Sequence, residues 1–345
     1  MKIFGLEARK DYPAKVTIDI NTQCNARCVI CPYPHLKDKL KHGIMEWDLY
    51  RKIIDEYADI CYSNKIMGEL SYCNMSEPTL LQNFPEFIKY ARDKGCFTIY
   101  FNTNVSKLTP KLVDELIRSK VYPAIHLNIM TFSKTKYKKV MGLDFNTLTS
   151  NLKYFLDRYP HCLIDVGFFT PFMDEEDREA VKKVFKDTKV TLHLTDNISD
   201  RARNVELPKD LSDFQSHKRE RAFGCSKNRP IHRMHINYDG RVYLCDQDMS
   251  LETNFGNVKD NSIQEIWNGK AMIETLKVLY GHAEPGKNSI PCFTCESCID
   301  SKNIKILKNS KDYKPRKLFS LPKRMLVKKG LAVVRKRGKL GWICP

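Results

Sequence analysis

The sequence has no long apolar run and no apolar signal core. No segment reaches the roughly 18 consecutive apolar residues that a membrane-spanning helix needs. Residues 1–15 contain no apolar stretch ahead of a small-residue cleavage site. Internal repeats of about 20–50 residues and low-complexity tracts are also missing, and 42% of the 345 residues are hydrophobic. We therefore expect a folded, cytoplasmic protein.

Acidic residues are scarce near the end of the chain. The formal net charge is +17, and between Lys308 and Lys339 thirteen residues are Lys or Arg while only Asp312 is acidic. Apolar residues such as Val334 are interleaved with them, which predicts a basic amphipathic helix in a tail over 306–345. Such a helix either lies on the anionic inner face of a membrane or packs on the body with a solvated charged face. The tail has few aromatics for stacking on bases, so we expect no nucleic-acid partner.

The chain is rich in cysteine. Its thirteen cysteines, in a sequence without an export signal, are hard to interpret as a disulfide framework because the cytosol keeps thiols reduced. Metal or cluster ligation is the leading explanation.

Short β-branched or aromatic runs alternate with longer amphipathic stretches over about residues 15–195, which predicts successive βα units around a parallel sheet. The predicted strands are Val16–Ile20, Ile66–Tyr72, Phe97–Asn102, Ala124–Ile129, Leu163–Phe169 and Val190–Leu194. Six such units suit an open barrel. In these folds ligands gather at the carboxyl ends of the strands, so the residues just after each strand are the candidate site residues.

Directly after the first predicted strand, Cys24, Cys28 and Cys31 follow a C-x3-C-x2-C spacing on one loop. Three thiolates can hold a 4Fe-4S cluster in which one iron has no protein ligand and can bind a substrate molecule. The alternative is a zinc site, which needs a fourth ligand such as His35 or His42.

This spacing at this place resembles the radical S-adenosylmethionine (radical SAM) superfamily. The resemblance implies a partial (β/α)6 TIM-like barrel and a first 4Fe-4S cluster that binds S-adenosylmethionine. It also implies that the cofactor-binding residues are Glu77, Pro78, Asn104, Asn128, Ser199 and Arg201. The sequence departs from the family pattern where Met75 and Ser76 replace two glycines, Val105 replaces a third, and Ile30 replaces the usual aromatic residue.

A second cysteine group comprises Cys225, Cys245, Cys292, Cys295 and Cys298. Distant pairs that close on each other can place four thiolates around one centre. A zinc ribbon is the alternative, because C-x2-C pairs at long separation are also zinc spacing. Cys298 can replace either Cys292 or Cys295 as the fourth ligand.

The surroundings of Cys245 are similar to the auxiliary-cluster domain called SPASM, or to its shorter twitch form. This resemblance implies a small C-terminal cysteine-rich domain with a second, auxiliary 4Fe-4S cluster. Asp246 and Asp248 beside Cys245, and Asp165 near a strand end, are candidate bases.

The predicted domains are 1–205 for the barrel, 206–305 for the auxiliary-cluster domain and 306–345 for the tail. The resemblance implies reductive cleavage of S-adenosylmethionine to a 5′-deoxyadenosyl radical, which abstracts hydrogen from a substrate while the auxiliary cluster takes up an electron. We expect an oxidoreductase that acts on a small molecule such as a sugar, alcohol or glycolipid precursor, with flavodoxin or ferredoxin as reductant. Peptide modification is one alternative, and a zinc-stabilised RNA- or protein-binding module is another.

Overall fold

The computed structural model describes residues 9–72, 74, 76–196, 198–285 and 290–300, together with the backbone of 333–334 and 340–341. Among these residues, no helix is long and apolar enough to cross a membrane.

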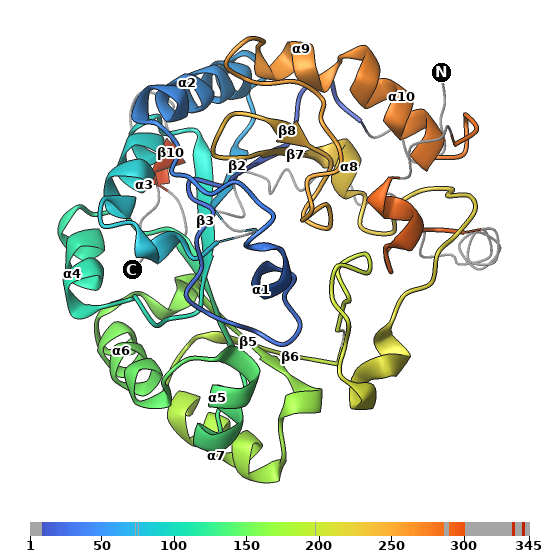
Figure 1. Ribbon diagram of the computed structural model, residues 1–345. Helices are drawn as coiled ribbons and strands as arrows, with labels where there is room; N and C mark the ends of the chain where they lie inside the picture. The colour runs from blue at the N-terminus through green and yellow to red at the C-terminus, as the bar shows by residue number, and fades with distance from the viewer. Residues whose placement is uncertain are drawn as a thin grey trace.

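A twisted sheet of eight strands, ordered β6-β5-β4-β3-β2-β1-β7-β8, forms the wall of an open barrel (Figure 1). Its strands are β1 Lys15–Ile18, β2 Gly68–Tyr72, β3 Phe97–Thr103, β4 Ala124–Met130, β5 Ile164–Phe169, β6 Thr191–Thr195, β7 Arg233–Ile236 and β8 Val242–Tyr243. Strands β1 to β6 pair in parallel in chain order. The six predicted strands and the α/β partial-barrel fold are confirmed.

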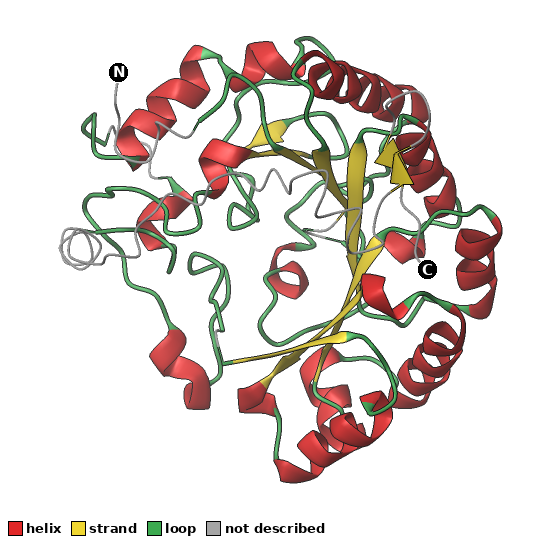
Figure 2. Cartoon of the chain, turned by 180° about the vertical axis from the view of Figure 1, so that it is seen from behind, coloured by secondary structure: helices red, strands yellow, loops and turns green. Residues whose placement is uncertain are grey.

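Helices cover the outer side of the sheet, as both views of the ribbon show (Figure 2). The longer ones are α2 Trp47–Ser63, α3 Phe84–Asp93, α4 Pro110–Arg118, α5 Lys134–Met141, α6 Phe145–Arg158, α7 Glu175–Phe185 and α10 Lys270–Leu279. The short ones are α1 Tyr33–Leu36, α8 Arg229–His232, α9 Ile263–Trp267 and the 3-10 turns η2 Pro78–Leu80, η3 His161–Leu163, η4 Thr170–Phe172, η5 Lys209–Phe214 and η6 Pro291–Thr294. Residues that satisfy the first-turn N–H groups explain several starts: Thr109 caps α4, for example, with Pro110 in its first turn.

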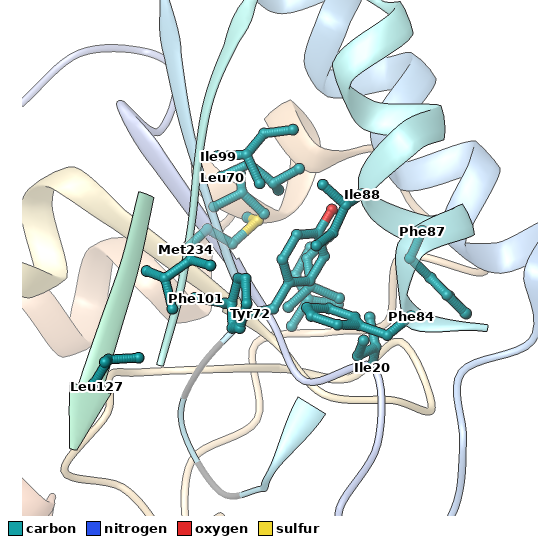
Figure 3. Packing of buried hydrophobic residues seen from close by; sticks show 14 of the residues in the cluster. Ile20, Leu70, Tyr72, Phe84, Phe87, Ile88, Ile99, Phe101, Leu127 and Met234 are labelled. Carbon is teal, nitrogen blue, oxygen red and sulfur yellow. The ribbon is translucent and has the colours of Figure 1, made fainter. Parts of the chain in front are cut away.

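The apolar core lies between the sheet and these helices (Figure 3). Along β3, Phe97, Ile99 and Phe101 are buried while the alternate residues are only partly so. Figure 3 shows Phe101 beside Tyr72 and Phe84, which come from β2 and α3. Burying each such side chain stabilises the fold by about 1.5–3 kcal/mol. Because strand residues alternate in direction, the other residues of β3 face the inside of the barrel.

The cysteine-rich region shares the sheet of the barrel. β7 pairs in parallel with β1, with Lys15 opposite Arg233 and Thr17 opposite His235, and β8 then returns antiparallel to β7. Sequence patterns did not predict this pairing. The boundary between residues 205 and 206 stays a prediction.

The predicted helix of the tail lies almost entirely outside the described residues. Within it, β9 Val333–Val334 pairs antiparallel with β10 Leu340–Gly341. These four residues form strands, so the helix prediction is wrong there.

Candidate functional site

The loop that carries Cys24, Cys28 and Cys31 is fixed from two sides. The backbone N–H groups of Arg27 and Val29 donate to carbonyls at the end of α5, at 2.9 and 3.0 Å. The N–H of Glu77, after β2, donates to the carbonyl of Gln23 at 2.9 Å. The loop is therefore held against the carboxyl ends of the parallel strands, where the fold places ligands.

Gly142 permits the contact between this loop and α5. It ends α5 with a left-handed φ of 69°, and a Cβ built on it would lie 3.0 Å from the Cβ of Arg27. A side chain there would combine backbone strain with a close contact to the cysteine loop.

Glu77 links the loops that follow β1, β2 and β3. Its carboxylate accepts hydrogen bonds from Thr79 Oγ1 at 2.6 Å, Thr103 Oγ1 at 2.8 Å and the N–H of Asn104 at 2.7 Å. Burial raises the pKa of Glu77, and these hydrogen bonds oppose that effect. Pro78 follows in the first turn of η2. The carboxylate therefore holds the exits of β2 and β3 together, while the backbone N–H of Glu77 contacts the segment that leads into the cysteine loop.

The thiols of the first group are costly to ionise as they stand. Burial raises the pKa of Cys24 to about 12, opposed by the N–H of Ala26, which donates to its sulfur at 3.4 Å. Burial raises the pKa of Cys28 as well, and the neighbouring Cys31 and Cys24 add to this effect. A bound cationic centre deprotonates such thiols, so the donor set suits a metal cluster.

Asn104 and Asn128 lie at two strand ends. The amide of Asn104 donates to Asn25 Oδ1 at 3.1 Å and lies 4.0 Å from the sulfur of Cys24. Asn128 lies half-buried on β4, opposite Gly167 and just before a bulge at Met130. Asn104 is thus in contact with the cysteine loop, whereas Asn128 lies one strand further along the sheet.

Ser199 and Arg201 lie in a strained turn after β6. Arg201, Ala202 and Arg203 all have φ between 52° and 66°, a conformation that costs a non-glycine residue about 1–2 kcal/mol. The fully buried Asp200 stabilises the turn through a bond from the N–H of Arg203. Burial raises the pKa of Cys31, and the positive charge of Arg201 opposes this effect. The pKa of Asp246 is raised by burial but lowered more by Arg229 and other cations, of which Arg201 is one. Arg201 therefore lies within electrostatic range of both cysteine groups.

The second group converges on one small cavity. Its lining contains Cys225, Cys245, Cys292, Cys295 and Cys298. All five are buried, and all have free thiols. The backbones of Cys225 and Cys298 lie opposite each other in an antiparallel β-bridge. Burial is the largest cause that raises the pKa of Cys292, and the other four cysteines raise it further. The structure brings all five predicted ligands together.

The two groups share one hydrogen-bonding pattern. Cys245 and Cys295 each accept a bond from the N–H two residues further on, at 3.4 and 3.3 Å, as Cys24 does. Such N–H groups are suited to thiolate ligands, because hydrogen bonds to the sulfurs help to set the potential of an iron–sulfur cluster.

Cys162, outside both groups, is disulfide-bonded.

The candidate bases differ in their surroundings. Asp246 pairs with Arg229 at 3.0 Å and lines a cavity inside the barrel. Burial raises its pKa, but Arg229 and other cations lower it more, so that the net shift is downward. The carboxylate of Asp248 accepts from Thr253 Oγ1 and from two N–H groups in the turn that follows. Asp165 lies 3.4 Å from His193 on the neighbouring strand. Of the two residues beside Cys245, only Asp246 lines the cavity.

Sequence reasoning missed His235. It is 1% exposed, lines the same cavity of about 460 Å³, and neither ring nitrogen has a hydrogen-bond partner among the described residues. Burial lowers its pKa to about 3. In the sequence His235 lies between Met234 and Ile236, a pattern that is typical of a buried strand in the apolar core. Only the register with β1 shows that it faces the inside of the barrel.

Both parts of the chain match known family models. Residues 18–188 match the radical SAM superfamily, and residues 225–299 match an iron-sulfur cluster-binding domain, SPASM. The second match begins at Cys225 and includes all five cysteines of the second group.

The chain is also similar to individual proteins. It is 21% identical over 292 residues to the tungsten-containing aldehyde ferredoxin oxidoreductase cofactor-modifying protein of Pyrococcus furiosus, covering 72% of this chain and 79% of that protein. The structure of BtrN in complex with AdoMet and 2-DOIA has a TM-score of 0.53 and 17% identity, over 84% of this chain and 93% of BtrN. That of anSMEcpe with bound AdoMet and Cp18Cys peptide has a TM-score of 0.52 and 15% identity, over 82% and 86%.

Proposed function

The chain is a radical SAM enzyme with a C-terminal SPASM domain, and from this we propose that it oxidises a small polar molecule. The observation that carries the proposal is the polar cavity inside the barrel. The lining of this cavity extends along β3 to Asn102. Asn102 is two residues before Asn104, which contacts the first cysteine loop. The lining also includes Asp246, which directly follows Cys245 of the second group.

When bound, a cluster held by Cys24, Cys28 and Cys31 would supply the electron for reductive cleavage of S-adenosylmethionine, and an auxiliary cluster would supply an electron acceptor. The protein holds the reactants and excludes water. Glu77 keeps the loops around the first cluster in register, and Asn104 and Arg201 are proposed to contact the cofactor. Pro78, Asn128 and Ser199 complete the proposed cofactor-binding residues.

Asp246 is the proposed proton acceptor. Oxidation of an alcohol by loss of hydrogen and an electron also requires a proton to leave. The carboxylate of Asp246 lines the cavity, is held ionised by Arg229, and is adjacent in sequence to a proposed ligand of the auxiliary cluster. A proton and an electron can therefore leave the substrate on the same side.

The carboxyl-terminal cysteines supply more thiols than one cluster needs. We propose a single auxiliary 4Fe-4S cluster with Cys225, Cys245, Cys292 and Cys295 as ligands, with Cys298 as the replacement for one of the last two. Flavodoxin or ferredoxin is the proposed reductant. A peptide substrate is the alternative, because one structural relative is described with a bound peptide.

Anaerobic purification with iron and sulfide counts, followed by reduction with dithionite and S-adenosylmethionine, tests the proposal. We expect about eight iron atoms, as two 4Fe-4S clusters require, and 5′-deoxyadenosine on chromatography. With a substrate deuterated at the oxidised carbon, deuterium should enter 5′-deoxyadenosine. Zinc without iron, or no 5′-deoxyadenosine from the fully reconstituted protein, would contradict the proposal.

A further inference from the structure

The inside of the barrel is lined by polar side chains in layers that the strand register defines. In the first layer, at the start of the strands, Lys15 lies opposite both Glu69 and Arg233. In the second, Thr17 lies opposite Ser71 and His235. Closed parallel barrels are instead filled by bulky apolar side chains in such layers. This interior is therefore suited to a ligand rather than to packing.

The cavity extends along most of β3. Thr98 and Asn102 of β3 both line it, and four residues of strand span about 13 Å. Its volume of about 460 Å³ lies within the range of small-molecule sites. One small molecule can thus extend from the first layer towards Asn104 and the first cysteine loop.

The first layer has an excess of positive charge. Among the described residues, Glu69 is its only acid and lies 3.8 Å from Lys15, but the side chain of Glu69 is 63% exposed while that of Lys15 is 14% exposed. Lys15 also lies 5.3 Å from the centre of the Tyr100 ring. Its ammonium group has three N–H donors, so it can contact an anion in the cavity beside its other partners. Arg233 lines the same end of the cavity. Asp246, the other acid in the lining, is already paired with Arg229.

The deeper layers offer hydrogen-bonding groups that no described residue uses. The Oδ1 atom of Asn102 and both ring nitrogens of His235 are buried without a partner among the described residues. A neutral imidazole has one donor and one acceptor nitrogen, and leaving such groups unsatisfied costs free energy. A ligand hydroxyl, which both donates and accepts, satisfies either group.

We propose that this cavity takes a hydroxylated small molecule carrying a phosphate or carboxylate, with Lys15 and Arg233 on the anion and His235 and Asn102 on the hydroxyls. The inference rests on the proposed function and names its substrate class. The anion lies at the strand starts, so the hydroxylated part extends towards the cofactor.

Calorimetric titration of the reconstituted holoenzyme, without reductant, tests the inference. The probes are glucose, glucose 6-phosphate and gluconate, which share hydroxyl groups and differ in the anion. We expect at least one of the two anions to bind about ten-fold more tightly than glucose, since a hydrogen bond to a charged group is worth that much. Which anion binds better identifies phosphate or carboxylate.

Arg233→Gln and Lys15→Gln should each remove most of this preference, while Arg178→Gln on the outer helix α7 should keep it. Iron content and thermal unfolding check that each variant is folded. No preference for either anion in the wild type, or a preference unchanged in both cavity variants, would overturn the inference. Because no radical is formed, this failure is distinct from a failure to produce 5′-deoxyadenosine.

Discussion

The two cysteine groups differ in how the chain assembles them. Cys24, Cys28 and Cys31 come from one loop of eight residues and are partly exposed, whereas the second group joins three segments between Cys225 and Cys298 and is buried throughout. Three ligands leave one iron of a 4Fe-4S cluster open, and four close it. The local group is thus suited to binding a reactant, and the distant group to holding a centre away from solvent.

Replacing the whole local group should have the largest effect. In Cys24→Ala/Cys28→Ala/Cys31→Ala we expect about four fewer iron atoms and no 5′-deoxyadenosine, because no open iron remains. Iron analysis and chromatography measure both. Cys61→Ala, at a buried thiol outside both groups, should retain iron and product.

Breaking the distant group should separate radical formation from oxidation. Cys245→Ala should lose about four iron atoms yet still form 5′-deoxyadenosine, because the first loop does not depend on it. Iron analysis and the cleavage assay on one preparation check this. Loss of both clusters in this variant would mean that the groups are not independent. Cys298→Ala should retain the iron if the other four cysteines are the ligands.

Glu77→Gln tests the hydrogen bonds that hold the exits of β2 and β3 beside the local group. An amide cannot accept all the bonds that the carboxylate accepts, so at least one buried N–H or hydroxyl loses its partner, at a cost of about 1–3 kcal/mol. We expect a lower free energy of unfolding in denaturant titration and weaker binding of S-adenosylmethionine by calorimetry. Glu86→Gln, at an exposed position in α3, is the matched control and should change neither.

Gly142→Ala compares backbone strain with a close contact. Gly142 and Gly95 have similar φ values of 69° and 71°, but the nearest atom to an added Cβ is 3.0 Å away at Gly142 and 3.9 Å away at Gly95. Both alanine variants should lose about 1 kcal/mol of stability. Only Gly142→Ala should also slow the cleavage of S-adenosylmethionine, and equal rates in the two variants would show that the contact with Arg27 is unimportant.

The last effect concerns His235 and develops only on acidification. Its pKa is lowered from 6.5 to about 3 in the folded protein, so between these values the unfolded state binds more protons. The contribution of His235 to the free energy of unfolding is fully present above pH 6.5. It decreases as the pH falls, by at most about 1.4 kcal/mol per pH unit. Denaturant titrations should show a shallower loss on acidification in His235→Gln than in the wild type. His217→Gln, with a side chain that is 72% exposed, should keep the wild-type slope.

Patterns that are local in sequence predicted the barrel and its first site. Alternation of strand and helix gave all six parallel strands, and the spacing of Cys24, Cys28 and Cys31 identified the loop after β1. Pairing between distant segments could not be read in this way. The contact of β7 with β1, and with it the position of His235 inside the barrel, depends on register across more than 200 residues of chain. A lone histidine between Met234 and Ile236 carries no local signal for that position.

The central claim is that the local group alone provides an open iron. Its most direct test is electron paramagnetic resonance of two reduced variants, Cys245→Ala with only the first cluster and the triple alanine variant with only the second, before and after adding S-adenosylmethionine. The account predicts a changed spectrum in Cys245→Ala and an unchanged one in the triple variant. A spectrum that changes in the triple variant, or stays the same in Cys245→Ala, would contradict it.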